Sequence, residues 1–243
     1  MKPAHGRLNV FENGEALALG VANWLTGRAL HAKGWFDLCL SGGTTPKRLY
    51  EILAAPPLLN RFPWALTRFT FGDERFVPPS DPASNAHMAQ QAMFLHVPVR
   101  PGQVHAMPTV GFTPQEAATQ YERELKCLYG QDELVPQKPL FDVTLLGVGD
   151  DGHTASLIPG QDVVEERRKW VGVVSKGRPE TRLTLTFPAL ESSAAVAFLL
   201  QGDGKQPILD RLLSDDDSVP AGMLRPVGEI FWFADRAAAG RWA

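Results

Sequence analysis

Cysteine is scarce in this sequence. Its 243 residues include only Cys39 and Cys127, which lie far apart in apolar or helical surroundings. Two unclustered cysteines argue against a disulfide framework and a cysteine-based zinc site, and they favour reduced, buried thiols in a cytoplasmic protein. The six histidines show no HxH or HxxxH spacing. We therefore expect no metal site.

Long runs of one chemical character are also missing. The formal net charge is −3, and no long basic run occurs, so we expect no nucleic-acid partner. There is no apolar run of about 18 residues, which argues against a membrane-spanning helix and a membrane partner. The N-terminal segment lacks the apolar stretch typical of a signal peptide. These absences favour a cytoplasmic location.

The sequence does contain short apolar segments that alternate with segments of helical periodicity. The predicted strands are 35–40, 68–71, a short one near Val104, 140–146, 170–174, 182–185, 194–200 and 229–233. The predicted helices are 12–32, 46–54, 84–95, 113–128 and 204–213. This rhythm predicts an α/β fold with an open, mostly parallel sheet and helices on both faces. The length suits a single domain, residues 1–243.

Ligands of such sheets bind at the carboxyl ends of the strands, so the residues after each strand are informative. Ser41–Pro46 (SGGTTP) follows the first predicted strand. Gly42 and Gly43 allow the backbone to approach an anion, the helix that begins there directs N–H groups at it, and Thr44 adds a hydroxyl. A tight turn with a capping threonine explains the same residues. The stretch is neither a Walker loop nor GxGxxG, so neither ATP nor NAD is indicated.

Three consecutive charged residues follow the second strand, within Gly72–Pro78 (GDERFVP). Arg75 can pair with an anionic oxygen, and Asp73 can accept hydrogen bonds from sugar hydroxyls. A solvated turn with a local ion pair is the alternative. Asn85 lies just after Ser84, a plausible N-cap of the next helix, and it can face the same site.

The most specific stretch is Gly147–Pro159 (GVGDDGHTASLIP), which follows the strand 140–146. Its glycines predict an irregular loop that presents Asp151 and His153 at the edge of the sheet. A carboxylate beside an imidazole can select its tautomer and raise its basicity. Ser156 is not in a GxSxG elbow, so no nucleophile accompanies the histidine. This pattern favours a histidine that activates water.

Basic residues complete the set. Lys176 lies between two predicted strands, and Arg182 is the first residue of the second one. Lys205 follows a glycine turn where a helix begins. Each is explained equally well as a surface charge. If they reach the same edge of the sheet, cations beside a helix N-terminus form a phosphate pocket. Together the stretches indicate an enzyme for a small phosphorylated substrate.

The quoted stretches, together with LSGGTTPKRLYE, FGDERFVPPSDPASNAH and the QGDGK turn, resemble the 6-phosphogluconolactonase family in order and spacing. The resemblance covers about Leu8 to Phe233. It implies an open, Rossmann-like sheet and hydrolysis of the δ-lactone of 6-phosphogluconate, the second step of the oxidative pentose phosphate pathway. It also implies a small phosphorylated sugar lactone as the binding partner and no metal or organic cofactor. Nothing in the sequence indicates an obligate interface, so we expect a monomer.

The resemblance implies roles residue by residue. His153 is the general base, Asp151 orients it, and Arg75 lies close to the reacting lactone group. The remaining matched positions bind substrate: the phosphate is held by Gly42, Gly43, Thr44, Arg182 and Lys205, while Asp73, Asn85 and Lys176 lie near the sugar or the rim.

Two alternatives stay open. Glucosamine-6-phosphate deaminases, in the same superfamily, carry a glutamate five residues after the histidine. This chain has Ile158 there, which cannot transfer protons. A non-catalytic sugar-phosphate-binding protein is the second alternative, and the presence of both Asp151 and His153 disfavours it.

Overall fold

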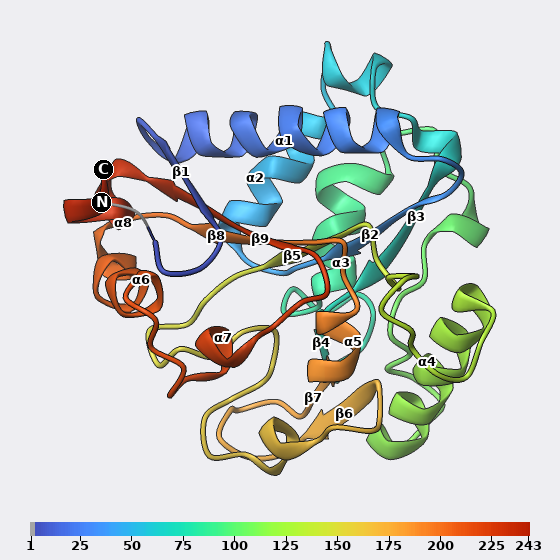
Figure 1. The fold of residues 1–243 in the computed structure, drawn as a ribbon. Helices are drawn as coiled ribbons and strands as arrows, with labels where there is room; N and C mark the ends of the chain where they lie inside the picture. Colours follow the sequence, from blue (N-terminus) through green and yellow to red (C-terminus); the bar gives the residue numbers. More distant parts are fainter. Residues whose placement is uncertain (1–2) are drawn as a thin grey trace.

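A six-stranded parallel sheet lies at the centre of the computed structural model, which describes residues 3–243 (Figure 1). Its strands are β1 (Arg7–Phe11), β2 (Phe36–Leu40), β3 (Thr67–Phe71), β5 (Val143–Leu146), β8 (Ala195–Leu200) and β9 (Glu229–Asp235). They lie in the order β1-β9-β8-β5-β2-β3, and all neighbours pair in parallel. The predicted open, mostly parallel sheet is confirmed.

The central strands are continuous apolar runs because both faces of the sheet are covered. In β8 every residue is buried. Ala195 and Ala197 belong to the hydrophobic core on one face, whereas Val196 and Phe198 belong to the core on the other. The alternation of side chains along a strand therefore separates two cores rather than a core from solvent.

Helices cover both faces of the sheet. One core includes residues of α1 (Gly14–His31), α2 (Thr44–Leu53) and α3 (Asn85–Ala89). The other includes residues of α4 (Pro114–Tyr129), α5 (Phe187–Glu191), α6 (Gln206–Leu213), α7 (Pro220–Met223) and α8 (Arg236–Ala239). Figure 1 shows α1 along one side of the sheet and α6 and α7 on the other. Within residues 3–243, no helix is both long and apolar enough to cross a membrane.

The long helix α4 illustrates how local sequence defines an element. Thr113 precedes it, and its hydroxyl accepts a hydrogen bond from the backbone N–H of Glu116. The Glu116 carboxylate in turn accepts from the backbone N–H of Thr113 at 2.8 Å. This reciprocal capping satisfies N–H groups that the helix itself leaves free. Gly130, with φ of +79°, ends the helix in the left-handed region.

A second, three-stranded antiparallel sheet lies beside the main one. It consists of β4 (Asp73–Arg75), β7 (Arg182–Leu185) and β6 (Val171–Val174), in that order. Strands β6 and β7 were expected from the sequence, but they lie outside the parallel sheet. The connection 175–181 is too short for a parallel crossover, which needs about a dozen residues, so the two strands form a hairpin.

The remaining differences from the sequence prediction are local. Strand β1 was not predicted, because an edge strand that alternates polar and apolar residues gives a weak signal. The strand expected near Val104 is an isolated parallel bridge between Val104 and Phe69. The helix expected over 84–95 is α3 continued by a π-helical turn, Gln90–Phe94.

Candidate functional site

A cavity of about 240 Å³ lies at the carboxyl ends of four adjacent strands, β8, β5, β2 and β3. The chain passes from β2 to β3 on one side and returns to β5 on the other side of β2, and ligands bind at such switch points. The cavity is lined by Ser41, Gly42, Gly43, Asp73, Arg75, Asn85, Gly147, Val148, Gly149, His153, Ala155, Arg182 and Lys205. The three strand-end stretches therefore meet in one pocket.

The centre of the site is the Asp151–His153 pair. The Asp151 Oδ1 atom lies 2.5 Å from Nδ1 of His153, and it also accepts the backbone N–H of His153 at 3.1 Å. Burial on its own raises the pKa of Asp151, yet hydrogen bonds from Arg178 and His153 outweigh it, and the pKa of this carboxyl lies well below its ordinary value. An ionised carboxylate can only accept, so Nδ1 carries the proton and donates. The other ring nitrogen, Nε2, is left with its lone pair.

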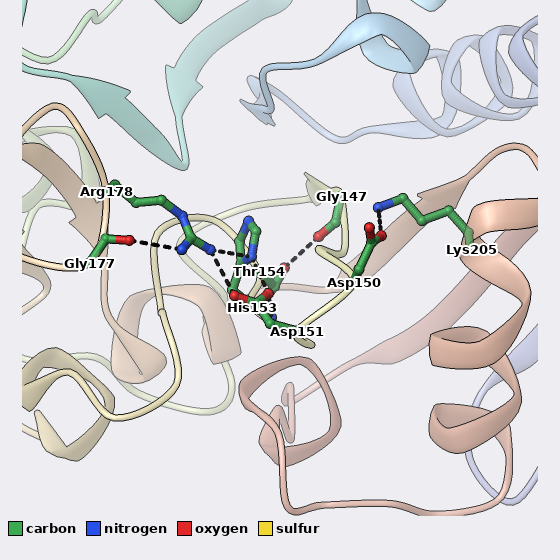
Figure 2. Close-up of polar contacts among 8 residues, drawn as sticks. All are labelled: Gly147, Asp150, Asp151, His153, Thr154, Gly177, Arg178 and Lys205. Atoms are coloured by element: carbon green, nitrogen blue, oxygen red, sulfur yellow. Dashed lines mark hydrogen bonds and ion pairs between the residues drawn. The ribbon is translucent and has the colours of Figure 1, made fainter.

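Figure 2 shows Nε2 of His153 on the side of the ring that points away from Asp151. In the described part of the chain, the hydrogen-bonding contacts of the ring all involve Nδ1. His153 lines the cavity, and its side chain is 25% exposed. The ring is therefore held at one nitrogen and available at the other, which is the arrangement of a general base.

Gly149 allows the close contact between Asp151, His153 and the backbone of the loop. A Cβ on Gly149 would lie 2.0 Å from Nδ1 of His153 and 2.7 Å from Oδ1 of Asp151, so only glycine allows the imidazole to lie against the backbone here. The Gly149 N–H donates to the carbonyl of His153 at 2.9 Å, and the hydroxyl of Thr154 donates to the carbonyl of Gly147 at 2.9 Å. These bonds close the loop tightly around the pair.

Asp73 and Asn85 form a second polar cluster, on the β3 side of the pocket. The Asp73 carboxylate is almost fully buried and accepts the Ser156 hydroxyl at 2.6 Å. The Asn85 side chain donates to the Asp73 carbonyl at 2.9 Å. A Cβ on Gly42 would lie 1.9 Å from Asn85 Oδ1, so the first glycine of the SGG turn allows β2 and α3 to approach. The turn thus has a packing role as well as the expected backbone approach to a ligand.

Glu74, the second of the three charged residues in the GDERFVP stretch, has a structural role that the sequence did not indicate. Glu74 is 1% exposed, and its carboxylate accepts from the backbone N–H groups of Arg75, Asn85 and Ala86 and from the Ser84 hydroxyl, at 2.7 to 2.9 Å. Burial raises the pKa of Glu74, and these four hydrogen bonds oppose that shift. Glu74 therefore fixes β4 to the first turn of α3.

Two arginines lie side by side at the pocket. Arg75 on β4 and Arg182 on β7 are directly opposite in the antiparallel register. Burial lowers the pKa of Arg182, and the neighbouring positive charge of Arg75 lowers it further. The Nε atoms of both arginines are buried and have no hydrogen-bond partner within residues 3–243. Two adjacent cations with free, buried donors can bind an anionic group.

The lining also includes the glycine turn before α2 and Lys205. Gly43, with φ of +105°, precedes α2, and no side chain caps that helix, so its first N–H groups remain available to an anion. The Lys205 ammonium lies 2.6 Å from Oδ1 of Asp150, and Figure 2 shows Lys205 on the opposite side of His153 from Arg178. Cationic groups therefore lie on both sides of the His153 imidazole.

The structure brings together most, but not all, of the residues that the sequence singled out. Asp151 does not line the cavity and acts on it through His153. Thr44 and Lys176 are exposed and lie outside the lining set. Arg178, which the sequence analysis passed over, contacts both members of the pair: its Nη2 donates to Asp151 Oδ2 at 2.7 Å and lies 3.1 Å from Nδ1 of His153. Nothing in the spacing of this basic loop distinguishes Arg178 from Lys176.

No group of three or more histidine, cysteine, aspartate or glutamate side chains in residues 3–243 has the arrangement of a metal site. A larger hollow of about 550 Å³ lies between α4 and β6, but none of the strand-end stretches contributes to it. The pocket around His153 is therefore the candidate active site.

Known proteins resemble this chain over nearly all of its length. The family model described as glucosamine-6-phosphate isomerases/6-phosphogluconolactonase matches residues 12–232. A 6-phosphogluconolactonase from Nostoc is 37% identical, with 86% of each chain covered. One from Rattus norvegicus is 35% identical, with 98% of this chain and 94% of the rat protein covered.

Solved structures give the same result. The 6-phosphogluconolactonase of Thermotoga maritima is 30% identical with a TM-score of 0.79, covering 94% of this chain and 98% of that one. The enzyme of Trypanosoma brucei is 26% identical with a TM-score of 0.84, covering 97% and 98%. A monomeric glucosamine-6-phosphate deaminase, only 20% identical, also reaches a TM-score of 0.81, so the fold alone does not separate the two activities. The chain belongs to the glucosamine-6-phosphate isomerase/6-phosphogluconolactonase family.

Proposed function

We propose that this protein hydrolyses 6-phospho-D-glucono-1,5-lactone to 6-phospho-D-gluconate, with His153 as the general base. The observation that supports the proposal most directly is the His153 imidazole, held at Nδ1 by Asp151 and open at Nε2, in a pocket with cations on both sides. The names of the relatives support the choice of substrate.

The absence of a usable nucleophile beside His153 favours attack by water over a covalent intermediate. Ser156 is fully buried, and its hydroxyl donates to Asp73. Burial raises the pKa of the Cys39 thiol to about 12, so it stays protonated at neutral pH. Cys127, which the sequence analysis expected to be buried, is instead exposed on α4, and it does not line the cavity.

The proposed reaction uses water as the nucleophile. Nε2 of His153 removes a proton from a water molecule whose oxygen attacks C1 of the lactone. The carbonyl electrons move to the oxygen, and the resulting oxyanion is stabilised by a cation such as Arg75 or by a backbone N–H group. The tetrahedral intermediate collapses as the C1–O5 bond breaks, and the imidazolium returns its proton to O5. The free carboxylic acid ionises at neutral pH.

Different lining residues bind the two ends of the substrate. In our proposal the phosphate is held by the free N–H groups at the start of α2, by Lys205 and by Arg182, while Asp73 accepts hydrogen bonds from the sugar hydroxyls and Asn85 lies near the sugar. Thr44 stays a predicted phosphate contact, and Lys176 stays a predicted contact near the sugar or the rim. The proposal places the product in the oxidative pentose phosphate pathway of the cytoplasm and the enzyme in solution as a monomer.

The test measures 6-phosphogluconate formation from lactone made in situ by a dehydrogenase, with 6-phosphogluconate dehydrogenase as the reporter and the spontaneous hydrolysis subtracted. Purified protein is expected to accelerate hydrolysis, and His153→Asn is expected to remove most of the acceleration, about 10²–10⁴-fold. An H153N variant that turns over as fast as wild type would show that the base is misassigned.

The deaminase alternative is tested in parallel. Ile158, five residues after His153, is 4% exposed and belongs to a hydrophobic core, and it does not line the cavity. No acid is thus available at that position to open a sugar ring. Ammonia release from glucosamine 6-phosphate would overturn the lactonase proposal. Binding of 6-phosphogluconate without any hydrolysis would instead indicate a non-catalytic sugar-phosphate-binding protein.

A further inference from the structure

Arg178 lies on the hairpin loop 175–181 between β6 and β7, whereas Asp151 and His153 lie on the loop after β5. Its guanidinium crosses from one loop to the other (Figure 2). Nη2 donates to Asp151 Oδ2 at 2.7 Å, and Nη1 donates to the carbonyl of Gly177 at 2.9 Å. The Arg178 side chain is 26% exposed, so the contact is partly shielded from water.

The two oxygens of Asp151 have different partners. Oδ1 faces the ring and backbone nitrogens of His153, and Oδ2 faces Arg178. A proton on Oδ2 would meet a guanidinium that has only donors and no acceptor. Arg178 therefore keeps Asp151 in the state that can only accept hydrogen bonds.

That state determines which nitrogen of His153 is the base. With Asp151 ionised, Nδ1 must donate, and Nε2 is free to take a proton in the pocket. If the carboxyl were protonated or rotated away, Nδ1 could instead accept from Arg178, which is only 3.1 Å away, and Nε2 would carry the proton. A histidine in this second tautomer cannot act as a base toward the pocket.

We propose that Arg178 is a positioning residue for the hydrolytic reaction, which orients the Asp151 carboxylate and thereby selects the Nδ1–H tautomer of His153. The inference rests on the proposed lactonase function, but its central claim concerns the tautomer. Arg178 is not itself among the residues that line the cavity, and it acts through the Asp151–His153 pair.

The experiment compares Arg178→Ala, Arg178→Gln and Arg178→Lys with wild type, with Arg168→Ala as the matched control. Arg168 is an exposed arginine near the same sheet, and its side chain makes no hydrogen bond or ion pair within residues 3–243. For each variant, kcat and KM are measured for the lactone, thermal unfolding is followed, and the tautomer of His153 is read at pH 8 from ¹⁵N–¹H two-bond correlations. The His153 signals are assigned by their loss in His153→Asn.

We expect kcat of Arg178→Ala to fall about 10-fold, less than the full contribution of a general base, with KM changed less than twofold. Its His153 signals are expected to shift toward the Nε2–H tautomer, and those of Arg168→Ala to stay as in wild type. Arg178→Lys, which keeps a charged donor, is expected to recover more kcat than Arg178→Gln. It also serves as the folded variant if removal of the whole side chain prevents folding.

Two results would overturn the inference. Unchanged kcat and an unchanged Nδ1–H tautomer in Arg178→Ala would show that Asp151 is oriented without Arg178. A rise in KM alone, with kcat and the tautomer unchanged, would show that Arg178 contacts substrate instead. Failure of the lactonase proposal is recognised separately, because wild type would then not exceed spontaneous hydrolysis, while the tautomer measurement would still report on Arg178.

Discussion

Gly149→Ala adds one methyl group at the point where the His153 imidazole lies against the backbone. The new Cβ would lie 2.0 Å from Nδ1 of His153, whereas ordinary contacts begin at 3.4 Å. The backbone of Gly149 does not have a positive φ, so alanine is sterically allowed at this position apart from its effect on the pair. The substitution therefore acts on the catalytic geometry rather than on the backbone.

The magnitude follows from the displacement. The imidazole must move by about 1.4 Å to restore normal contact, and misplacement of about 1 Å costs on the order of 10²-fold in rate. We expect kcat to fall about 100-fold, or about 2.7 kcal/mol of transition-state stabilisation. The partly exposed His153 side chain can rotate outward, so the loss in the free energy of unfolding should stay near ~1 kcal/mol.

The assay is the coupled lactonase measurement, with thermal unfolding as the check on folding. Gly147→Ala is the matched control, because a Cβ there meets no atom within 4 Å. The Gly147→Ala variant should keep kcat. Any loss of activity should appear as a higher KM, since Gly147 lines the cavity. A folded Gly149→Ala variant with kcat within threefold of wild type would refute the argument that Nδ1 must be held in this position.

Three further predictions concern binding and stability. Arg182→Ala and Lys205→Ala should raise KM with little change in kcat, because a phosphate group is remote from C1, and an unchanged KM in both would remove them from the phosphate site. Glu74→Ala should lower the free energy of unfolding by about 3 kcal/mol in urea titrations, because four buried or partly buried donors lose their acceptor; a loss below 1 kcal/mol would contradict this. The pKa of Asp151 is lowered in the folded state, so its stabilising contribution is present above its ordinary pKa of 3.8 and is lost as pH falls through the folded value. The difference in Tm between wild type and Asp151→Asn should accordingly be clear at pH 7 and shrink below pH 3.8.

The GDERFVP stretch shows where prediction from sequence reaches its limit. Three adjacent charges after an apolar strand indicated an unusual turn, and Asp73 and Arg75 do line the pocket. The stretch is nevertheless a strand of a second sheet, and Glu74 is buried beneath α3. Its burial depends on hydrogen bonds from residues about ten positions further along the chain, which no local pattern encodes.

The placement of the basic residues in and after the loop 175–181 also could not be predicted from the sequence. Lys176 and Arg178 lie in this loop and Arg182 follows it, and the sequence analysis assigned roles to Lys176 and Arg182 but none to Arg178, although each is compatible with a surface position. In the structure Arg182 lies in the pocket opposite Arg75, Arg178 holds Asp151, and Lys176 is exposed. The direction of each side chain depends on the hairpin between β6 and β7 and on the approach of the loop after β5.

Local sequence patterns were enough to predict the α/β class, because buried parallel strands need continuous apolar runs and their covering helices need a 3.6-residue periodicity. The local sequence was decisive here. It also determined the Asp-Gly-His loop, because that chemistry lies within three consecutive residues. The tertiary structure alone decided which of the distant cations surround His153, and it placed a second sheet beside the first. These features depend on pairings such as Arg75 with Arg182 and Arg178 with Asp151, between residues far apart in the chain, whose energies exist only once the strands have been brought together.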